Sequence, residues 1–274
     1  MRRRIPVTLL SPSGRFLGAF EPPGEPRGLT RYAQFERHRD EPFTLAVAGK
    51  IVAAKIANQR RLLQRLDANH HRLDPVLPER LAALRDAAAL AENLDALRGC
   101  EGAAAAAYLP AWAAFLPEAF PFERRSTRPP LNPVNACLSY VSTLLYGEVL
   151  SACHARGLDP AFGHLHPSTD DRWSLPLDLM EPFRPCVAEA LTLRLFSHRV
   201  LRAEHFEKVK NNGIYLNKEG RRQLLQHYEK TLNREHYSEF AQCRTSLRRQ
   251  IENTVLHYKT ALADPERFAP FRMN

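Results

Sequence analysis

Cysteine is scarce in this 274-residue sequence, and its positions form no recognisable pairing. An odd number of cysteines is scattered along the chain without a Cys-x-x-Cys pair: Cys100, Cys137, Cys153, Cys186 and Cys243. This pattern argues against a disulfide framework and against a zinc ribbon. Unpaired cysteines are typical of proteins in the reducing cytosol, so we expect a cytoplasmic protein.

Long hydrophobic runs are also missing. No stretch approaches the roughly 20 continuous apolar residues that a membrane-spanning helix needs, so we expect no membrane association. Three arginines at positions 2–4 precede a short apolar run that ends at Ser11. That run is too short for a signal peptide with a cleavage site, and it instead predicts a β-strand that enters a turn.

Common signatures of covalent catalysis and of zinc peptidases are absent too. The sequence contains no His-Glu-x-x-His motif and no recognisable Ser/His/Asp or Cys/His arrangement. His164 and His166 leave open a zinc hydrolase of another kind, although no further histidine lies near the acidic candidates. Activity that zinc supports and that Mg²⁺ or Mn²⁺ cannot replace would favour that alternative.

Basic residues, by contrast, are abundant. Lysine and arginine number 39 against 30 aspartate and glutamate residues, which gives a formal net charge of +9. Such an excess suits a protein that binds nucleic acid, and it equally suits plain solubility. Charge alone therefore does not decide between these interpretations.

Helical periodicity dominates from about residue 42 onward. Apolar residues from Leu45 to Leu63 recur on one side of a helical wheel, with Lys50, Arg61 and Arg65 on the other. Further helices are predicted at 78–97, around 103–107, at 133–156, from 179 onward, at 219–233 and at 236–263. Strand-like runs at 5–10 and 16–20 predict a hairpin, and a second small hairpin is expected around 211–216. The sequence therefore predicts a mainly α fold.

The same pattern divides the chain into three parts. Residues 1–20 form the predicted β-hairpin, and residues 21–41 are expected to be a linker because proline and glycine are concentrated there. Residues 42–274 form the predicted helical domain, which is long enough to bury a substantial core.

Four residues in separate polar settings are the candidate site. Glu101 lies between two glycines, His166 ends a Gly-His-Leu-His segment, and Asp178 and Glu181 are spaced to share one face of a helix. Carboxylates with one imidazole are a hard, incomplete ligand set suited to Mg²⁺ or Mn²⁺. On a basic chain, the natural substrate of such a metal is a nucleic-acid phosphodiester. Taken singly, each residue also has an ordinary structural explanation, such as a helix N-terminus enriched in acids.

An ordered set of sequence blocks narrows these alternatives. The blocks are 5–18 (IPVTLLSPSGRFLG), 55–59 (KIANQ), 97–102 (LRGCEG), 132–136 (NPVNA), 144–148 (LLYGE), 157–160 (GLDP), 163–166 (GHLH) and 177–185 (LDLMEPFRP). In this order they resemble the CRISPR-associated spacer-acquisition integrase, the endonuclease subunit of the adaptation complex. The similarity extends from residue 5 to about residue 235.

The resemblance implies a function and a site. It implies a metal-dependent DNA endonuclease and integrase with Glu101, His166 and Asp178 as catalytic metal ligands and Glu181 as a weaker one. The expected cofactor is Mg²⁺ or Mn²⁺. The implied reaction joins the 3′-OH ends of a prespacer into a CRISPR repeat array by transesterification. The implied partners are double-stranded DNA, a second copy of the chain in a homodimer, and a small ferredoxin-like adaptation protein.

The resemblance also implies residues that contact DNA phosphates. Arg184 matches an arginine beside the site and is the first candidate. The remaining candidates are basic positions of the helical domain: Lys50, Arg61, Arg65, Arg124, Arg125 and Arg128.

The start of the chain departs from the family pattern. Members of the family carry a β-rich N-terminal domain before the Ile-Pro-Val-Thr-Leu-Leu segment, and here only its last two strands are expected, as a remnant. We therefore expect a truncated chain that keeps the helical catalytic domain. The alternative is a non-catalytic remnant that binds DNA or takes part in assembly.

Overall fold

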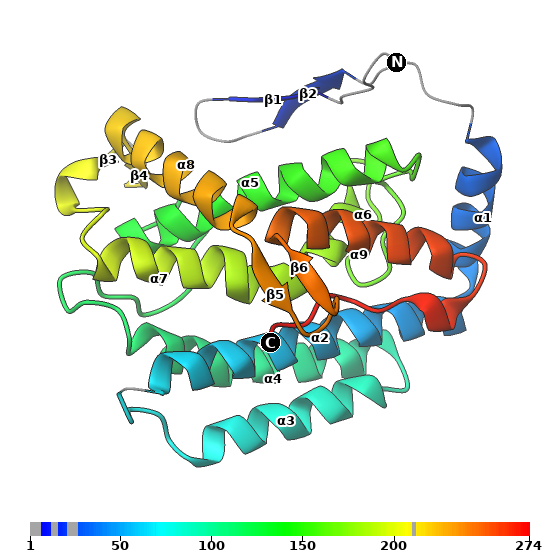
Figure 1. Ribbon diagram of the computed structural model, residues 1–274, viewed down its shortest axis with the longest axis horizontal. Coiled ribbons are helices and arrows are strands. Elements are labelled where there is room, and N and C mark those ends of the chain that lie inside the picture. The colour runs from blue at the N-terminus through cyan, green and yellow to red at the C-terminus, as the bar shows by residue number, and fades with distance from the viewer. Residues whose placement is uncertain (1–6, 12–15, 21–26, 69, 210–211) are drawn as a thin grey trace.

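A computed structural model of the protein describes residues 7–11, 16–20, 27–68, 70–209 and 212–274. Most of this described chain is helical, and the long helices stack roughly side by side (Figure 1). The α-helices are α1 (Gly28–Arg39), α2 (Glu41–Asp67), α3 (Val76–Ala89), α4 (Leu94–Ala113), α5 (Pro133–Ala155), α6 (Ser174–Met180), α7 (Ala190–Ser197), α8 (Lys218–Asn233) and α9 (Leu247–Ala261). The prediction of a mainly α fold is confirmed.

The strands in the described ranges pair as local antiparallel hairpins. β1 (Val7–Leu10) pairs with β2 (Phe16–Phe20), β3 (Phe206–Lys208) with β4 (Ile214–Leu216), and β5 (His236–Ser238) with β6 (Cys243–Thr245). The first two pairs confirm the predicted hairpins, although residues 5 and 6 of the first lie outside the described ranges. In Figure 1 the β1–β2 hairpin lies along α5 at the edge of the helical stack.

Side-chain caps set the start of the helices that carry the core. Asp40, Asn93 and Asn132 precede α2, α4 and α5, and each side-chain oxygen accepts a hydrogen bond from the backbone N–H three residues later. Such caps satisfy donors that the first helical turn leaves unpaired. The local sequence thus fixes where each helix begins.

Helix α2 is the central element. Its apolar residues, including Ile51, Val52 and Ile56, are buried, and it packs against α3, α4 and the irregular helix that follows α6. Lys55 lies in the middle of this helix, and its side chain is mostly buried. An ammonium group at this position therefore needs acidic or polar partners from the elements that pack around the middle of α2.

Helix α5 is the one described helix that is long and apolar enough, by composition alone, to cross a membrane. Just over half, 56%, of its most apolar window is buried inside the protein, against α6, α9 and neighbouring segments. That burial is typical of a core helix in a globular fold.

The helical stretch 174–197 changes its winding at two prolines. Residues Glu181–Phe183 form a 3₁₀ turn that includes Pro182, and Arg184–Glu189 form a π-helical segment that includes Pro185. Proline lacks the N–H that a regular α-helix requires, which explains the change of winding at Pro182 and Pro185. The change of winding sets the directions of Glu181 and Arg184.

Some predicted boundaries differ from the structure. The helix expected over 236–263 begins only at Leu247, because the β5–β6 hairpin precedes it and Ser246 caps α9. The helix expected over 78–97 is divided between α3 and α4 at residues 90–93. Helix α1 lies in the stretch expected as a linker, 21–41, of which residues 21–26 are outside the described ranges. The buried Gln34 side chain anchors α1 through two hydrogen bonds with the backbone of Asp159. Its Nε2 donates to the Asp159 carbonyl, and its Oε1 accepts from the Asp159 N–H.

Candidate metal centre

The predicted site residues lie on elements that meet around the middle of α2. Glu101 lies on α4, His166 in the loop before α6, Asp178 on α6, and Glu181 at the start of the 3₁₀ turn. Residues separated by up to 80 positions therefore share one polar region inside a helical core. The sequence identified each member, and the fold brings them together.

Lys55, which the sequence analysis did not single out as a site residue, connects two of the acids. Its Nζ lies 2.6 Å from Glu101 Oε1 and 2.5 Å from Glu181 Oε2. The three side chains are 13%, 22% and 4% exposed, so water screens their charges only weakly. Burial alone would lower the pKa of Lys55, but the charges of Glu181 and Glu101 outweigh burial and raise it.

Glu101 and Glu181 both contact a cationic side chain, and Glu181 is the more deeply buried of the two. Burial would raise the pKa of Glu181, but the charges of Lys55 and Arg184 dominate and lower the pKa to about 2, so the carboxylate is ionised. Oε1 accepts a hydrogen bond from Arg184 at 3.1 Å. Oε2 is buried without a hydrogen bond of good geometry, so its contact with Lys55 is ionic. Lone pairs on Oε2 are therefore available to a cation.

His166 and Asp178 form a tightly coupled pair. The His166 Nδ1 lies 2.6 Å from Asp178 Oδ1. An ionised carboxylate only accepts hydrogen bonds, so Nδ1 carries the proton and the neutral ring presents the lone pair of Nε2. Burial lowers the pKa of His166, whereas the hydrogen bond to Asp178 and the surrounding acids raise it, and the net effect is an increase.

The Asp178 carboxylate is fully buried and already has four donors. Oδ2 accepts from the backbone N–H groups of His164 (2.5 Å) and Leu165 (2.9 Å), and Oδ1 accepts from the His166 N–H (3.0 Å) and from the His166 ring. Two carboxylate oxygens offer about four lone-pair positions, so this set occupies them all. Asp178 thus holds the loop and the His166 ring in place.

The loop that carries His166 is fixed from its other side by His164. The His164 ring is buried, with Nδ1 3.0 Å from Thr44 Oγ1 and Nε2 2.8 Å from the Tyr258 hydroxyl. Burial lowers the pKa of His164 to about 4, so the ring is neutral near pH 7. With both nitrogens engaged, His164 does not join His166 as a ligand, which removes the geometric basis for the zinc alternative.

No group of three or more His, Cys, Asp or Glu side chains within the described ranges is assembled as they lie to hold a metal ion. Glu101 and Glu181 instead converge on the Lys55 ammonium, and His166 lies close enough to the same acids that their charges raise its pKa. A buried carboxylate oxygen without a hydrogen bond, a second carboxylate and a free imidazole nitrogen are the donors that Mg²⁺ or Mn²⁺ accepts. The residues therefore fit a divalent cation.

Arg184 extends the site toward a second buried acid. Its guanidinium bonds Glu181, and the charges of Glu181 and then Glu189 help to raise its pKa. Glu189 accepts a hydrogen bond from the buried Tyr108 hydroxyl at 2.8 Å. Burial raises the pKa of Glu189 more than its positive neighbours lower it. Arg184 is thus the predicted basic residue that lies directly at the site.

The other predicted basic residues either are hydrogen-bonded to groups outside the site or are exposed at the surface. Arg125 donates to the Asn135 and Ser139 side chains, and burial with the nearby Arg184 charge lowers its pKa to about 10. Lys50 donates to the Pro265 carbonyl, and Arg61 to the carbonyl of Asn274. Arg65, Arg124 and Arg128 are exposed. Their proposed contacts with DNA remain predictions.

Comparison with known proteins identifies the family to which the chain belongs. The sequence pattern of the family described as CRISPR associated protein Cas1 matches residues 1–230. The chain belongs to the Cas1 family. The Glu101, His166 and Asp178–Arg184 segments all lie inside the matched region.

Relatives in the Cas1 family share about a third of their residues with this chain. It is 36% identical over 244 residues to the CRISPR-associated endonuclease Cas1 2 of Rhodospirillum rubrum, covering 84% of this chain and 70% of that protein. It is also 36% identical over 271 residues to Cas1 1 of Thermus thermophilus, covering 99% and 81%. A Cas4/Cas1 fusion of Rhodospirillum rubrum matches over 44% of its own length.

Solved structures share the fold. A Cas1 protein from Thermotoga maritima aligns with a TM-score of 0.79 at 28% identity, over 95% of this chain and 79% of that one. A chain of a Cas6-RT-Cas1–Cas2 complex aligns at 0.83 with 26% identity, over 98% and 30%. A casposase bound to an integration product aligns at 0.82, over 99% and 80%, and at 22% identity this likeness shows the fold alone.

Proposed function

We propose that this chain is a metal-dependent DNA endonuclease and integrase subunit that joins prespacer 3′-OH ends to a CRISPR repeat array. The observation that carries the proposal is that Glu101 and Glu181 both contact the Lys55 ammonium and lie close enough to His166 for their charges to raise its pKa. Membership of the Cas1 family and the basic charge of the chain support the same conclusion.

The proposed ligands of Mg²⁺ or Mn²⁺ are Glu101, Glu181 and His166. The sequence pattern favoured Asp178 over Glu181, but the four hydrogen bonds to Asp178 support a positioning role for it. A carboxylate that orients a ligating histidine from its far nitrogen is common in metal sites. When bound, the metal would neutralise charge on the phosphate under attack and make a bound hydroxyl more nucleophilic.

The proposed reaction is a transesterification at phosphorus. The 3′-oxygen of the prespacer forms a bond to a phosphorus of the repeat, and the bond from that phosphorus to the repeat 3′-oxygen breaks. The proton of the attacking hydroxyl is matched by the proton that the leaving 3′-oxygen gains, so no external oxidant or energy source is needed. The chain's own contribution is to place Arg184 beside the site, where a guanidinium can pair with a phosphate.

The proposed substrate is double-stranded DNA, both as the prespacer and as the repeat array, and the proposed site of action is the cytosol. The Cas1 relative aligned from a Cas6-RT-Cas1–Cas2 complex supports a partner protein. We further propose that the chain works as a homodimer with a small ferredoxin-like partner.

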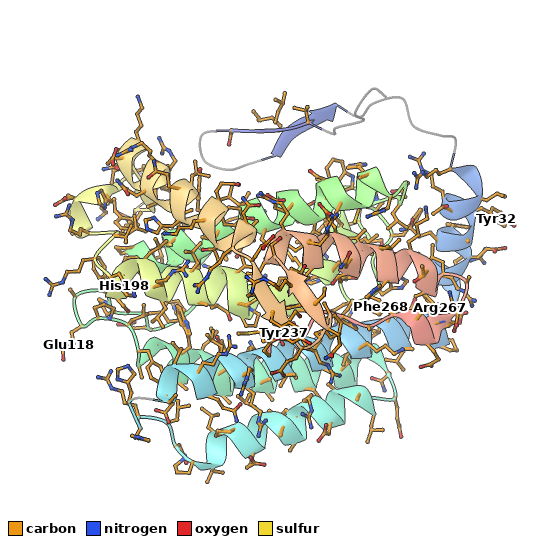
Figure 2. The ribbon with its side chains drawn as sticks, viewed as in Figure 1. Tyr32, Glu118, His198, Tyr237, Arg267 and Phe268 are labelled. Carbon is orange, nitrogen blue, oxygen red and sulfur yellow. The ribbon has the colours of Figure 1, made fainter. Side chains whose placement is uncertain are left out.

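Strand joining by the purified chain tests this proposal. A labelled duplex with 3′-OH ends would be incubated with a supercoiled repeat-bearing plasmid and Mn²⁺, with and without the small partner. Joining by the parent and by Glu118→Gln, but not by Glu101→Gln or His166→Ala, is the expected result. Glu118 is a suitable control because it is exposed at the edge of the molecule, away from α2 (Figure 2). Joining that survives both site substitutions would overturn the assignment, and no joining by the parent or any variant would favour a non-catalytic protein that binds DNA or takes part in assembly.

A further inference from the structure

Lys55 has an unusual position for a lysine in a site of this kind. Its ammonium contacts two carboxylates that are proposed metal ligands, at 2.6 Å and 2.5 Å. The side chain is 13% exposed, so both ion pairs are largely shielded from water. Lys55 thus occupies the point where the two negative charges meet.

Without a cation at this point, the two acids would be unfavourably close. Glu181 is nearly fully buried, and its Oε2 makes no hydrogen bond of good geometry, so only positive charge compensates that atom. Arg184 balances the charge on Oε1 of Glu181. It makes no ion pair with Glu101, so Lys55 is the cation that pairs with Glu101. Removing one partner of a buried ion pair leaves an uncompensated charge, which destabilises a fold strongly.

A divalent cation bound by Glu101 and Glu181 needs the same oxygens and the same space. It would also repel a neighbouring ammonium in a region where screening is weak. The long, flexible lysine side chain can withdraw, whereas a residue fixed on two sides, such as His166, cannot. The two glutamates can therefore pair with the Lys55 ammonium or bind a divalent cation, but not both at once.

We propose that Lys55 is an internal counter-cation that holds Glu101 and Glu181 together until a divalent metal displaces it. The lysine keeps the site assembled in the metal-free protein, and it weakens metal binding because two ion pairs must break first. This inference rests on the proposed function, since it assumes that Glu101 and Glu181 are metal ligands. It assigns to Lys55 a positioning role.

Binding of Mn²⁺ measured by the loss of the free-ion EPR signal, together with thermal unfolding of the metal-free protein, tests the inference. Lys55→Met removes the charge and keeps the length of the side chain. We expect this variant to melt at a lower temperature without metal and to bind Mn²⁺ about tenfold more tightly than the parent, because no ammonium competes. Lys55→Gln, which can still donate a hydrogen bond, is expected to shift both quantities in the same directions and serves if the methionine variant does not fold.

A matched control is Lys259→Met, which removes a half-buried lysine of α9 that donates to the Arg156 carbonyl. Its melting temperature is expected to change and its Mn²⁺ affinity to match that of the parent. Equal or weaker Mn²⁺ binding by both Lys55 variants would overturn the inference. Glu101→Gln separates the two proposals: if it abolishes binding while the Lys55 variants bind like the parent, the site stands and the role of Lys55 falls. If Glu101→Gln binds Mn²⁺ normally, the proposed site falls, and the inference with it.

Discussion

Asp178 fixes both the ring and the backbone of His166. Oδ1 lies 2.6 Å from the His166 ring nitrogen Nδ1 and 3.0 Å from its backbone nitrogen. One buried carboxylate therefore determines where the histidine sits and which of its nitrogens remains free.

Asp178→Asn is expected to release the His166 ring. The asparagine keeps one acceptor oxygen, so part of the donor set around it loses its partner, at a cost of about 1–3 kcal/mol per buried group. ¹⁵N-resolved NMR of the imidazole at alkaline pH should show the Nδ1–H tautomer in the parent and a shift toward Nε2–H in the variant. A parent ring already in the Nε2–H form would contradict the assignment.

Gly163→Ala is expected to displace the loop that holds Asp178. A Cβ at this position would lie 2.7 Å from Ser174 Cβ and 2.8 Å from Asp178 Oδ2, which forces the packing apart. We expect destabilisation of about 1–3 kcal/mol, typical of overpacking. Thermal or urea unfolding measures the change.

Gly102→Ala is the matched control for that substitution. Gly102 lies on α4 beside Glu101, and an added Cβ would meet nothing within 4 Å. Alanine is favoured over glycine inside a helix by about 1 kcal/mol, so the control should be neutral or more stable. Similar destabilisation by both alanines would show that the loss at Gly163 does not come from the clash with Ser174 and Asp178, and would contradict this packing.

Arg248 joins three helices through carboxylates. Its Nη2 lies 2.8 Å from Glu148 on α5 and 2.9 Å from Glu229 on α8, and the arginine itself is on α9. Arg248→Ala should lower the free energy of unfolding by about 1 kcal/mol at pH 7, because the network is partly exposed. Denaturant unfolding of parent and variant measures this difference.

The pH dependence of that difference follows from Glu229. Hydrogen bonds and charge from Arg248 lower the pKa of Glu229. Protons therefore bind the unfolded state first, and the stabilisation is present at neutral pH and lost as the pH falls through the lowered pKa. The gap between parent and Arg248→Ala should shrink below pH 4, and a gap that widens under acid would contradict this account.

The cysteines should differ sharply in reactivity. Cys243 is exposed, whereas burial raises the pKa of Cys137 to about 12 and also raises the pKa of Cys153 and Cys186. The thiolate is the reactive form, so the buried thiols of Cys137 and Cys153 should react with Ellman's reagent at pH 8 only after unfolding. Cys243→Ser should remove the fastest phase of labelling, and only the partly exposed Cys100 and Cys186 should still react in the folded protein. A fast phase that persists in this variant and includes a buried cysteine would contradict the packing.

The sequence predicted the helices best where a cap and a long apolar stripe coincide. α5 and α8 match their predicted ranges to within a residue or so, because Asn132 and Asn217 mark their starts. The helix expected over 236–263 was wrong at its beginning, since the β5–β6 hairpin has strands of three residues that carry no clear alternation. α1 was not predicted because its sequence is mostly polar and it is held by contacts with distant loops.

The acids and the histidine that the sequence singled out lie together in the structure, with Arg184 beside them. Lys55 lies in the quoted segment 55–59, but a lysine within a helical stripe gives no local sign that two distant carboxylates surround it. The roles that we propose for Asp178 and Glu181 were equally hidden, because they depend on which carboxylate accepts hydrogen bonds from the backbone of residues 164–166. Only tertiary contacts distinguish a carboxylate that positions a ligating histidine from a carboxylate that binds the metal itself.

The central claim is that Glu101, Glu181 and His166 bind one divalent cation while Asp178 does not. A crystal of the protein soaked in Mn²⁺ and measured at the manganese absorption edge tests it most directly. We predict an anomalous peak between the two glutamates and the His166 Nε2, with the Lys55 ammonium withdrawn from both carboxylates. A peak bonded to Asp178, or Mn²⁺ bound only away from these side chains, would contradict the account.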